Sequence, residues 1–458
     1  MARAKLKTYV TAAGFLLVVF IITTILKSLQ PEGSALGSPF ALGLFPHLRK
    51  TEKSDTHLHV PEHIVTTRTA PAEGERRPEE RAMSLQVAHK DFPAPNYNLH
   101  AFYYSWYGNP QFDGKYIHWD HPVLPHWDSK VDSRYPKERH SPPEDIGANF
   151  YPALGAYSSR DPSVVEAHMQ QLRTAAVGVI ALSWYPPNTK DDNGEPTDDI
   201  TPLVLDVAHK YQMKPGAVHH RVAFHIEPYK GRDEQSMFSN VKYIIERYGG
   251  HPAFFRYKST DGVTRPLFYV YDSYLLGPEK WANLLKRNGH HSIRNTPFDG
   301  LFIALLVEEN HKSDILASGF DGIYTYFATN GFTYGSSHRN WKPIKSFCDR
   351  NSLLFIPSVG PGYVDTSIRP WNSQNMRNRI NGKYYETSFD AAVEARPDIV
   401  SITSFNEWHE GTQIENAVPK TSGKTVYQDY LPHKSDVYLE ITRKWSEIFV
   451  KERKKWLV

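Results

Sequence analysis

Residues 399–413 read Ile-Val-Ser-Ile-Thr-Ser-Phe-Asn-Glu-Trp-His-Glu-Gly-Thr-Gln, an apolar run followed at once by two acids. Residues 399–405 are rich in β-branched side chains and predict a buried strand. Glu407 and Glu410 then place two carboxyl groups at the end of that strand. Neighbouring carboxyl groups can have their pKa values pushed apart, so that one donates a proton while the other accepts one. A surface turn with solvated acids is the alternative interpretation.

Seven further strand-like runs precede this one, and helical patterns separate most of them. The eight predicted strands are residues 99–104, 177–184, 222–226, 267–271, 300–307, 322–327, 353–359 and 399–405. The predicted helices are residues 163–176, 201–212, 233–248, 278–287, 312–319, 341–350, 387–395 and a final amphipathic segment, 438–456. Strands and helices that alternate eight times over about 360 residues predict an α/β fold, a (β/α)8 barrel of the TIM type. A doubly wound open sheet is the competing topology, but it usually carries a glycine-rich phosphate turn, which this sequence lacks.

The N-terminal part of the chain has a different composition. Residues 9–26 are uncharged and apolar, and as a helix they would be about 27 Å long, which predicts one transmembrane signal-anchor. Basic residues in the segment 1–8 favour a cytoplasmic tail and a type II orientation with the rest of the chain lumenal. A cleaved signal peptide is the alternative. Residues 27–96 are rich in Pro, Glu, Arg, Ser and Thr, which predicts a disordered, flexible lumenal stem before a catalytic domain at 97–458.

The overall composition excludes several classes of function. The formal charge is only +3, and no long basic run lies in the aromatic-rich part, so we expect no nucleic-acid partner. Cys348 is the only cysteine, which excludes an intramolecular disulfide and a cysteine-built zinc site. No His-Glu-x-x-His motif occurs, and we expect no metal and no cofactor. The sequence gives no indication of the oligomeric state.

Aromatic and polar residues are concentrated where the predicted strands end. This holds at residues 102–110, 183–187, 224–229, 269–274, 306–309, 324–330 and 357–363. In a (β/α)8 barrel, the loops after the strands form the active face. Aromatic faces stack on the C–H faces of sugar rings, while carboxylates, His and Asn bond the hydroxyl groups. The pattern therefore predicts an open groove for a carbohydrate.

The residues that end these strands also carry a family resemblance. Residues 102–116, 225–229, 324–331 and 404–415 form long and specific motifs, and through them the region from about 97 to 455 resembles glycoside hydrolase family 99. The resemblance implies a retaining endo-acting α-1,2-mannosidase of the Golgi membrane. Such an enzyme trims glucosylated high-mannose N-glycans on glycoproteins and releases glucosyl-α-1,3-mannose.

Two other classes of function remain as alternatives. A non-catalytic lectin for glucosylated N-glycans would need the same aromatic groove but not both acids. A type II glycosyltransferase would share the anchor and stem, but that class often carries an Asp-x-Asp motif, which is absent from this chain.

The resemblance also assigns roles to individual residues. Glu407 would deprotonate the 2-hydroxyl of the reacting mannose, giving a 1,2-anhydro sugar, and Glu410 would protonate the departing oxygen and then activate water. This scheme requires a raised pKa at Glu410 and an ionised Glu407. The residues expected to bind substrate are Tyr103, His225, Glu227 and Tyr326 at the reacting subsite, Trp184 and Tyr185 on the glucose side, and Asn406 and Trp408 beside the acids. Residues 188–199 would cover the glucose side.

One stretch departs from the family pattern. Residues 215–221 look inserted before the third predicted strand. The insertion lies at the amino end of that strand, so we expect no effect on the chemistry. A shift in the register of the strand would instead misplace His225 and Glu227.

Overall fold

Parallel strands form the centre of the protein, which is seen in a computed structural model that describes residues 92–210, 220–259, 261–423 and 425–456. In the described residues the main strands are β1 (Asn96–Tyr103), β3 (Val177–Trp184), β4 (Arg221–Ile226), β6 (Thr264–Val270), β7 (Leu301–Leu305), β8 (Gly322–Tyr324), β9 (Leu354–Ile356), β10 (Ser358–Val359) and β11 (Val400–Ile402). They pair side by side in the order β10-β11-β1-β3-β4-β6-β7-β8-β9, and every pair in this path is parallel.

The two ends of this sheet are neighbours in the chain. β9 pairs with β8, β10 pairs with β11, and only Pro357 separates β9 from β10. Proline has no N–H to donate to a sheet, which accounts for the interruption. The strand predicted at 353–359 is thus two short strands, and the sheet curls into a nearly closed barrel. The predicted (β/α)8 barrel of the TIM type is confirmed.

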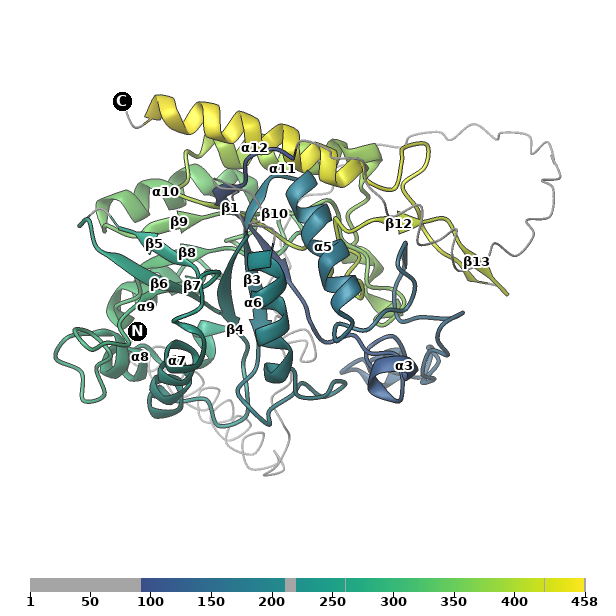
Figure 1. The fold of residues 1–458 in the computed structure, drawn as a ribbon, viewed down its shortest axis with the longest axis horizontal. Helices are drawn as coiled ribbons and strands as arrows, with labels where there is room; N and C mark the ends of the chain where they lie inside the picture. The colour runs from purple at the N-terminus through teal and green to yellow at the C-terminus, as the bar shows by residue number, and fades with distance from the viewer. Residues whose placement is uncertain (1–91, 211–219, 260, 424, 457–458) are drawn as a thin grey trace, which may run out of the picture. The chain divides into compact units, whose positions relative to one another are not determined.

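Helices cover the outside of the barrel (Figure 1). They are α5 (Pro162–Thr174), α6 (Thr201–Lys210), α7 (Glu234–Tyr248), α8 (Pro278–Leu285), α9 (His311–Ser318), α10 (Trp341–Arg350), α11 (Lys383–Glu394) and α12 (Val437–Trp456). Local signals start several of them: Asp161 accepts a hydrogen bond from the N–H of Ser163 at α5, and Asp233 forms a capping box with Ser236 at α7. The final amphipathic helix packs against α5 and α11.

Shorter elements lie in the connections. Helices α3 (Pro110–Asp113) and α4 (Ser129–Asp132) follow β1, and β5 (Arg256–Lys258) pairs antiparallel to β6. The remaining strands are β2 (Tyr151–Pro152), which pairs with β12 (Ala417–Val418), and the hairpin of β13 (Thr421–Ser422) and β14 (Thr425–Val426).

Aromatic side chains fill the barrel interior. The ring of Phe102 lies 4.7 Å from that of His225 and 5.4 Å from that of Tyr269, centroid to centroid. The hydroxyl of Tyr269 bonds His100 at 2.7 Å, and burial lowers the pKa of His100 to about 3, so this histidine is neutral. This packed floor leaves the loops after the strands as the place for chemistry.

Four predictions concern residues that lie wholly or mostly outside the described part of the chain. The cytoplasmic tail, the transmembrane anchor and nearly all of the stem fall within residues 1–91, and most of the proposed insertion falls within 211–219. The helices that the structure does describe include none with the length and apolar character needed to cross a membrane. After the proposed insertion, β4 pairs with β3 in regular register, with His225 opposite Ser183. The register shift that would have misplaced His225 and Glu227 is therefore absent.

Candidate active site

The two acids lie on a loop that folds back on itself after β11. We call residues 403–416 the catalytic loop. The N–H of Ser404 donates to the carbonyl of Thr412 at 2.9 Å, and the N–H of Ile414 donates to the carbonyl of Ser404 at 3.0 Å. Within the loop, Glu407 is 4% exposed and Glu410 is 9% exposed. The interpretation of this stretch as a solvated surface turn is therefore wrong.

Different groups contact the two carboxyls. Oε1 of Glu407 accepts a hydrogen bond from the N–H of His409 at 2.9 Å, and the N–H of Glu407 donates to Ser404 Oγ at 2.7 Å. Oε1 of Glu410 lies 3.8 Å from Nη1 of Arg369. The same guanidinium atom is 3.2 Å from Oδ2 of Asp365. Arg369 thus brings a cation to Glu410 on a loop that follows β10.

Burial raises the pKa of both carboxyl groups. It raises the pKa of Glu410 to about 7, and the charge of Arg369 opposes this rise. Burial, reinforced by the charge of Glu410, raises the pKa of Glu407 well above its usual range. The raised pKa expected for Glu410 is confirmed. The scheme also requires an ionised Glu407, but burial stabilises the protonated form of this side chain. Glu407 must therefore lose that proton before it can act as a base.

One wall of the site combines three predicted residues. Oε1 of Glu227 accepts a hydrogen bond from Ser183 Oγ at 2.8 Å and lies 3.1 Å from Nδ1 of His225. The ring of His225 stacks on that of Tyr326 with centroids 5.7 Å apart. The hydroxyl of Tyr326 bonds that of Tyr104. His225, Glu227 and Tyr326 therefore come together as predicted. Burial raises the pKa of Tyr326, and the charges of Glu410 and Glu407 raise it further.

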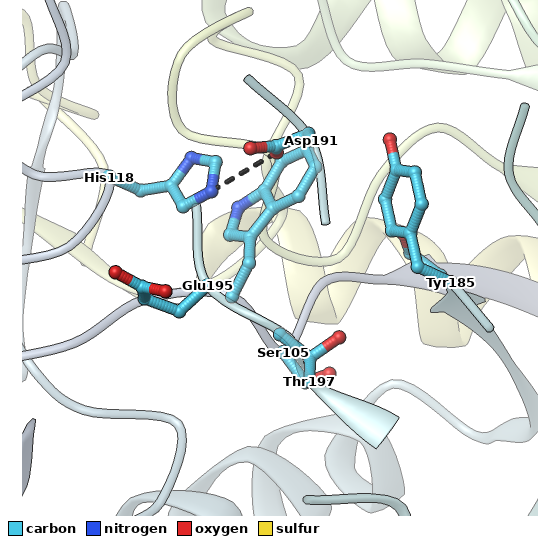
Figure 2. Close-up of a pocket in the computed structure, with 8 residues that line it drawn as sticks. Ser105, His118, Tyr185, Asp191, Glu195 and Thr197 are labelled. Atoms are coloured by element: carbon cyan, nitrogen blue, oxygen red, sulfur yellow. Dashed lines mark ion pairs between the residues drawn. The ribbon is translucent and has the colours of Figure 1, made fainter. Parts of the chain in front are cut away.

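A pocket lies on the predicted glucose side, and Figure 2 shows it with Tyr185 on its wall. Nε2 of His118 forms an ion pair with Oδ2 of Asp191 at 3.2 Å. Although burial alone would raise the pKa of Asp191, the His118 charge and hydrogen bonds lower it to about 2. Residues 188–199 contribute three lining residues, as expected of a covering segment. The lining residues are Ser105, Trp106, His118, Ser183, Tyr185, Asp191, Glu195 and Thr197.

Two aromatic residues predicted to bind substrate lie elsewhere. Trp184 is buried outside the barrel, where its Nε1–H donates to Asp198 at 2.7 Å. Tyr103 is buried and its hydroxyl bonds Nδ1 of His168 on α5 at 2.9 Å. Successive side chains of a strand point to opposite faces of the sheet. Trp184 and Tyr103 point away from the barrel interior, and the residue next to each of them points inward. Trp184 and Tyr103 thus have hydrogen-bond partners inside the protein, and their contact with substrate stays a prediction.

Asn406 and Trp408 are also buried away from any open surface. The side-chain amide of Asn406 bonds both the N–H and the carbonyl of Tyr104, each at 2.7 Å. The indole N–H of Trp408 donates to Glu415 at 2.9 Å. Both side chains have hydrogen-bond partners within the protein, and their contact with substrate stays a prediction.

Three residues at the site were not predicted from the sequence. Tyr104 follows Tyr103 at the end of β1, and only the alternation of the strand distinguishes them. Arg369 and Asp365 lie in the long loop after β10, where no aromatic or acidic cluster marks a site. Their one sequence signal is a pair of opposite charges four positions apart. Among the described residues, no group of three or more His, Cys, Asp or Glu side chains is arranged to hold a metal ion.

Comparison with known proteins identifies the family. The model of "Glycosyl hydrolase family 99" matches residues 94–451, which is most of the chain. The chain belongs to glycosyl hydrolase family 99. It is a glycoside hydrolase, and the resemblance stated from its motifs is confirmed.

Its relatives in family 99 cover the chain widely. A glycoprotein endo-alpha-1,2-mannosidase from Xenopus laevis is 59% identical over 463 residues, spanning 100% of both chains. A human glycoprotein endo-alpha-1,2-mannosidase-like protein is 64% identical over 361 residues, 79% of this chain and 78% of its own. Among solved structures, the family 99 endo-alpha-mannosidase from Bacteroides thetaiotaomicron has 44% identity and a TM-score of 0.72, covering 79% of this chain and 100% of its own.

Proposed function

We propose that this protein is a retaining endo-α-1,2-mannosidase that acts on glucosylated high-mannose N-glycans of glycoproteins and releases glucosyl-α-1,3-mannose. The observation that carries the proposal is the pair of buried acids, Glu407 and Glu410, on the active face of a family 99 barrel. The pocket around Tyr185 and Asp191 supplies aromatic and polar groups on the predicted glucose side. The named activities of the relatives support the same reaction.

The mechanism assigns a different task to each acid. Ionised Glu407 removes the proton of the mannose 2-hydroxyl, and that oxygen attacks the anomeric carbon as the glycosidic bond breaks. Glu410 gives its proton to the departing oxygen, so a 1,2-anhydro sugar and a shortened glycan form. Glu410 then takes a proton from water, which opens the anhydro ring at the anomeric carbon, while Glu407 returns its proton to the 2-oxygen. Two inversions give retention.

The electrostatics of the site support this division of tasks. An acid with a pKa near 7 is well placed to donate a proton at neutral pH, as Glu410 must. The cation of Arg369 stabilises the ionised form of both acids and so favours loss of the proton from Glu407. Glu227, held by Ser183, provides a buried carboxylate oxygen for a sugar hydroxyl.

The test incubates the purified full-length protein with a glucosylated high-mannose glycan and follows the products by mass and by NMR. We expect a disaccharide whose anomeric configuration is first that of the substrate. Glu407→Gln and Glu410→Gln should each lower kcat by at least about 100-fold, while Glu279→Gln, on the exposed side of α8, should not. Release of a monosaccharide alone would show that the cut is not internal. Binding without any cleavage would establish the lectin instead.

A second substrate tests the role of the 2-hydroxyl. We expect a glycan that carries 2-deoxymannose at the reacting position to remain uncut, because Glu407 would have no hydroxyl to deprotonate. Cleavage of that substrate would mean that Glu407 attacks the anomeric carbon directly, as in the usual retaining scheme.

A location in the Golgi membrane completes the proposal. The apolar run at residues 9–26 supports a single-pass type II anchor with the barrel on the lumenal side, where glycoprotein N-glycans are processed.

A further inference from the structure

Glu415 lies at the far end of the catalytic loop and takes no part in the proposed chemistry. It is 0% exposed. Three side chains surround its carboxylate: Nε2 of His168 lies 3.1 Å from Oε1, while the hydroxyl of Tyr157 and the indole N–H of Trp408 each donate to Oε2 at 2.9 Å. An indole N–H can only donate, so Glu415 must accept from Trp408. A buried carboxylate with three donors is fully satisfied without touching the substrate.

These contacts lead directly to the two acids. Trp408 follows Glu407 in the chain and precedes Glu410 by two residues, so its indole fixes the turn between them. The hydroxyl of Tyr107 holds the backbone on both sides of Glu407, because it donates to the carbonyl of Asn406 and accepts from the N–H of Trp408, both at 3.1 Å. Tyr157, which donates to Glu415, also accepts a bond from Asn406 at 3.3 Å.

The network ties the catalytic loop to two other elements. His168 belongs to α5, and its Nδ1 bonds the hydroxyl of Tyr103 at the end of β1. Asn406, in turn, clamps the backbone of Tyr104, whose hydroxyl reaches Tyr326 in the site. Glu415 is therefore the shared acceptor that joins the loop, α5 and, through them, β1.

We propose that Glu415 is a positioning residue for the hydrolysis: by holding the indole of Trp408 and the hydroxyl of Tyr157, it fixes the relative placement of Glu407 and Glu410. The proposal rests on the function proposed above. Proton transfer to the leaving oxygen and from the 2-hydroxyl must occur at two points of one sugar, and a displacement of about 1 Å in such a group can cost about 100-fold in rate. The role of Glu415 is to provide hydrogen-bond acceptors in the right place.

The chemistry of glutamine makes this role separable from the charge. In Glu415→Gln, the amide oxygen can still accept from Trp408 and Tyr157. The amide N–H can donate to Nε2 of His168 if that ring carries its proton on Nδ1 and donates to Tyr103 instead. Glu415→Leu, of similar size, offers no acceptor: Tyr157 and His168 lose their bonds to the carboxylate, and the Trp408 indole keeps only its longer bond to the Tyr157 hydroxyl at 3.2 Å.

The experiment measures kcat and KM of the full-length protein on the glucosylated glycan for four variants. We expect Glu415→Leu and Trp408→Phe each to lower kcat by about 30- to 100-fold with KM changed less than about threefold. Glu415→Gln should restore kcat to within about threefold of the wild type. The double variant Glu415→Leu/Trp408→Phe should be no slower than the slower single variant, because both remove the same bond. Trp408→Phe removes only one donor, so it keeps the test open if Glu415→Leu does not fold.

The matched control is Thr442→Val, which breaks the buried hydrogen bond between Thr442 on α12 and Tyr385 on α11, remote from the site. It should lower thermal stability without changing kcat. A folded Trp408→Phe variant with wild-type kcat, a rise in KM alone, or additive losses in the double variant would each overturn the proposal. Crystal structures of Trp408→Phe and the wild type decide the matter independently: displaced carboxyls support positioning and unmoved carboxyls contradict it. The crystallographic comparison remains valid even if the wild type releases no disaccharide. That result would contradict the proposed function and not the positioning role of Glu415.

Discussion

At the scale of single residues, two opposing effects set the protonation of the two acids: their burial and the positive charge of Arg369. Burial favours the neutral forms of Glu407 and Glu410, and the guanidinium of Arg369 favours their charged forms. At Glu410 the result is a pKa of about 7, in the range where a carboxyl group can both give and recover a proton. Arg369 donates a hydrogen bond to Asp365, so the protein fixes the position of the guanidinium relative to the acids.

This balance predicts a pH dependence of catalysis. Glu410 must be protonated to act as the acid and Glu407 ionised to act as the base, so kcat/KM should pass through a maximum: it falls at low pH, where Glu407 takes up a proton, and at high pH, where Glu410, with a pKa of about 7, loses its proton. A pH series from 5 to 9 measures it. Glu279→Gln should leave the profile unchanged, and a flat profile between pH 6 and 9 would contradict the assigned role of Glu410.

The same group affects stability with a definite sign. The folded pKa of Glu410 lies above the ordinary value of 4.5, so its contribution to stability is present below about 4.5 and is lost as pH rises through about 7. At pH 8, Glu410→Gln should therefore raise the free energy of unfolding by about 1 to 3 kcal/mol. At pH 4 the variant and the wild type should unfold together. Urea denaturation at both values gives the comparison, and a gain at pH 4 but not at pH 8 would show that the sign is wrong.

Removing the cation should shift the pH profile upward. Arg369→Met removes the cation that lowers the pKa of Glu410 and leaves the negative charge of Asp365, which raises that pKa, uncompensated. The pKa of Glu410 should therefore rise further. We expect the alkaline limb of kcat/KM to move to higher pH by at least about one unit, with a lower maximum because Glu407 is harder to ionise. Arg369→Lys, which keeps the charge, should move the limb less. An unchanged limb in Arg369→Met would mean that the guanidinium does not act on Glu410.

At the scale of elements, the sequence shows where strands end better than which way their side chains point. All eight predicted strands exist, because apolar runs bounded by turn residues are a strong local signal. The face of each residue depends on register against its neighbours. Trp184 was predicted to meet the substrate, but the inward position at the end of β3 is that of Ser183, which bonds Glu227. The same difference of one position occurs at the end of β1, where Tyr103 was predicted to contact substrate and the neighbouring Tyr104 lies at the site. Arg369 could not be found because its partner, Glu410, lies on a different element.

One tight contact between elements gives a stability prediction. A Cβ atom added at Gly178 in β3 would lie 2.3 Å from the carbonyl oxygen of Asn96 in β1, and backbone atoms cannot yield easily. Gly178→Ala should lower the free energy of unfolding by about 1 to 3 kcal/mol. At the exposed Gly250, an added Cβ meets nothing within 4 Å, so Gly250→Ala should change it by less than about 1 kcal/mol. Equal effects in chemical denaturation would show that β1 moves freely to admit the methyl group.

At the scale of the whole molecule, the proposed anchor and the barrel are separate parts of the chain. Residues 9–26 carry the apolar run, whereas the family match begins at residue 94. We predict that the full-length chain stays in the membrane fraction after carbonate extraction, while a chain that starts at residue 92 is released with kcat within about twofold. Replacing two apolar residues, Leu17→Arg and Phe20→Arg, in the full-length chain should also release it. A mature protein that begins shortly after the apolar run, about 30 residues in, would establish a cleaved signal peptide instead.

The closure of the catalytic loop on itself has a consequence for inhibitors. Ser404 and Ile414 fasten the two ends of the loop, and the acids between them are almost completely buried. A ligand that meets Glu407 and Glu410 therefore does not have to order them, and little affinity is lost to the entropy of the protein. What remains is the entropy of the ligand itself. A compound locked in the conformation that spans both carboxyls should gain the most, and flexible analogues with the same functional groups should bind more weakly in proportion to their free torsions.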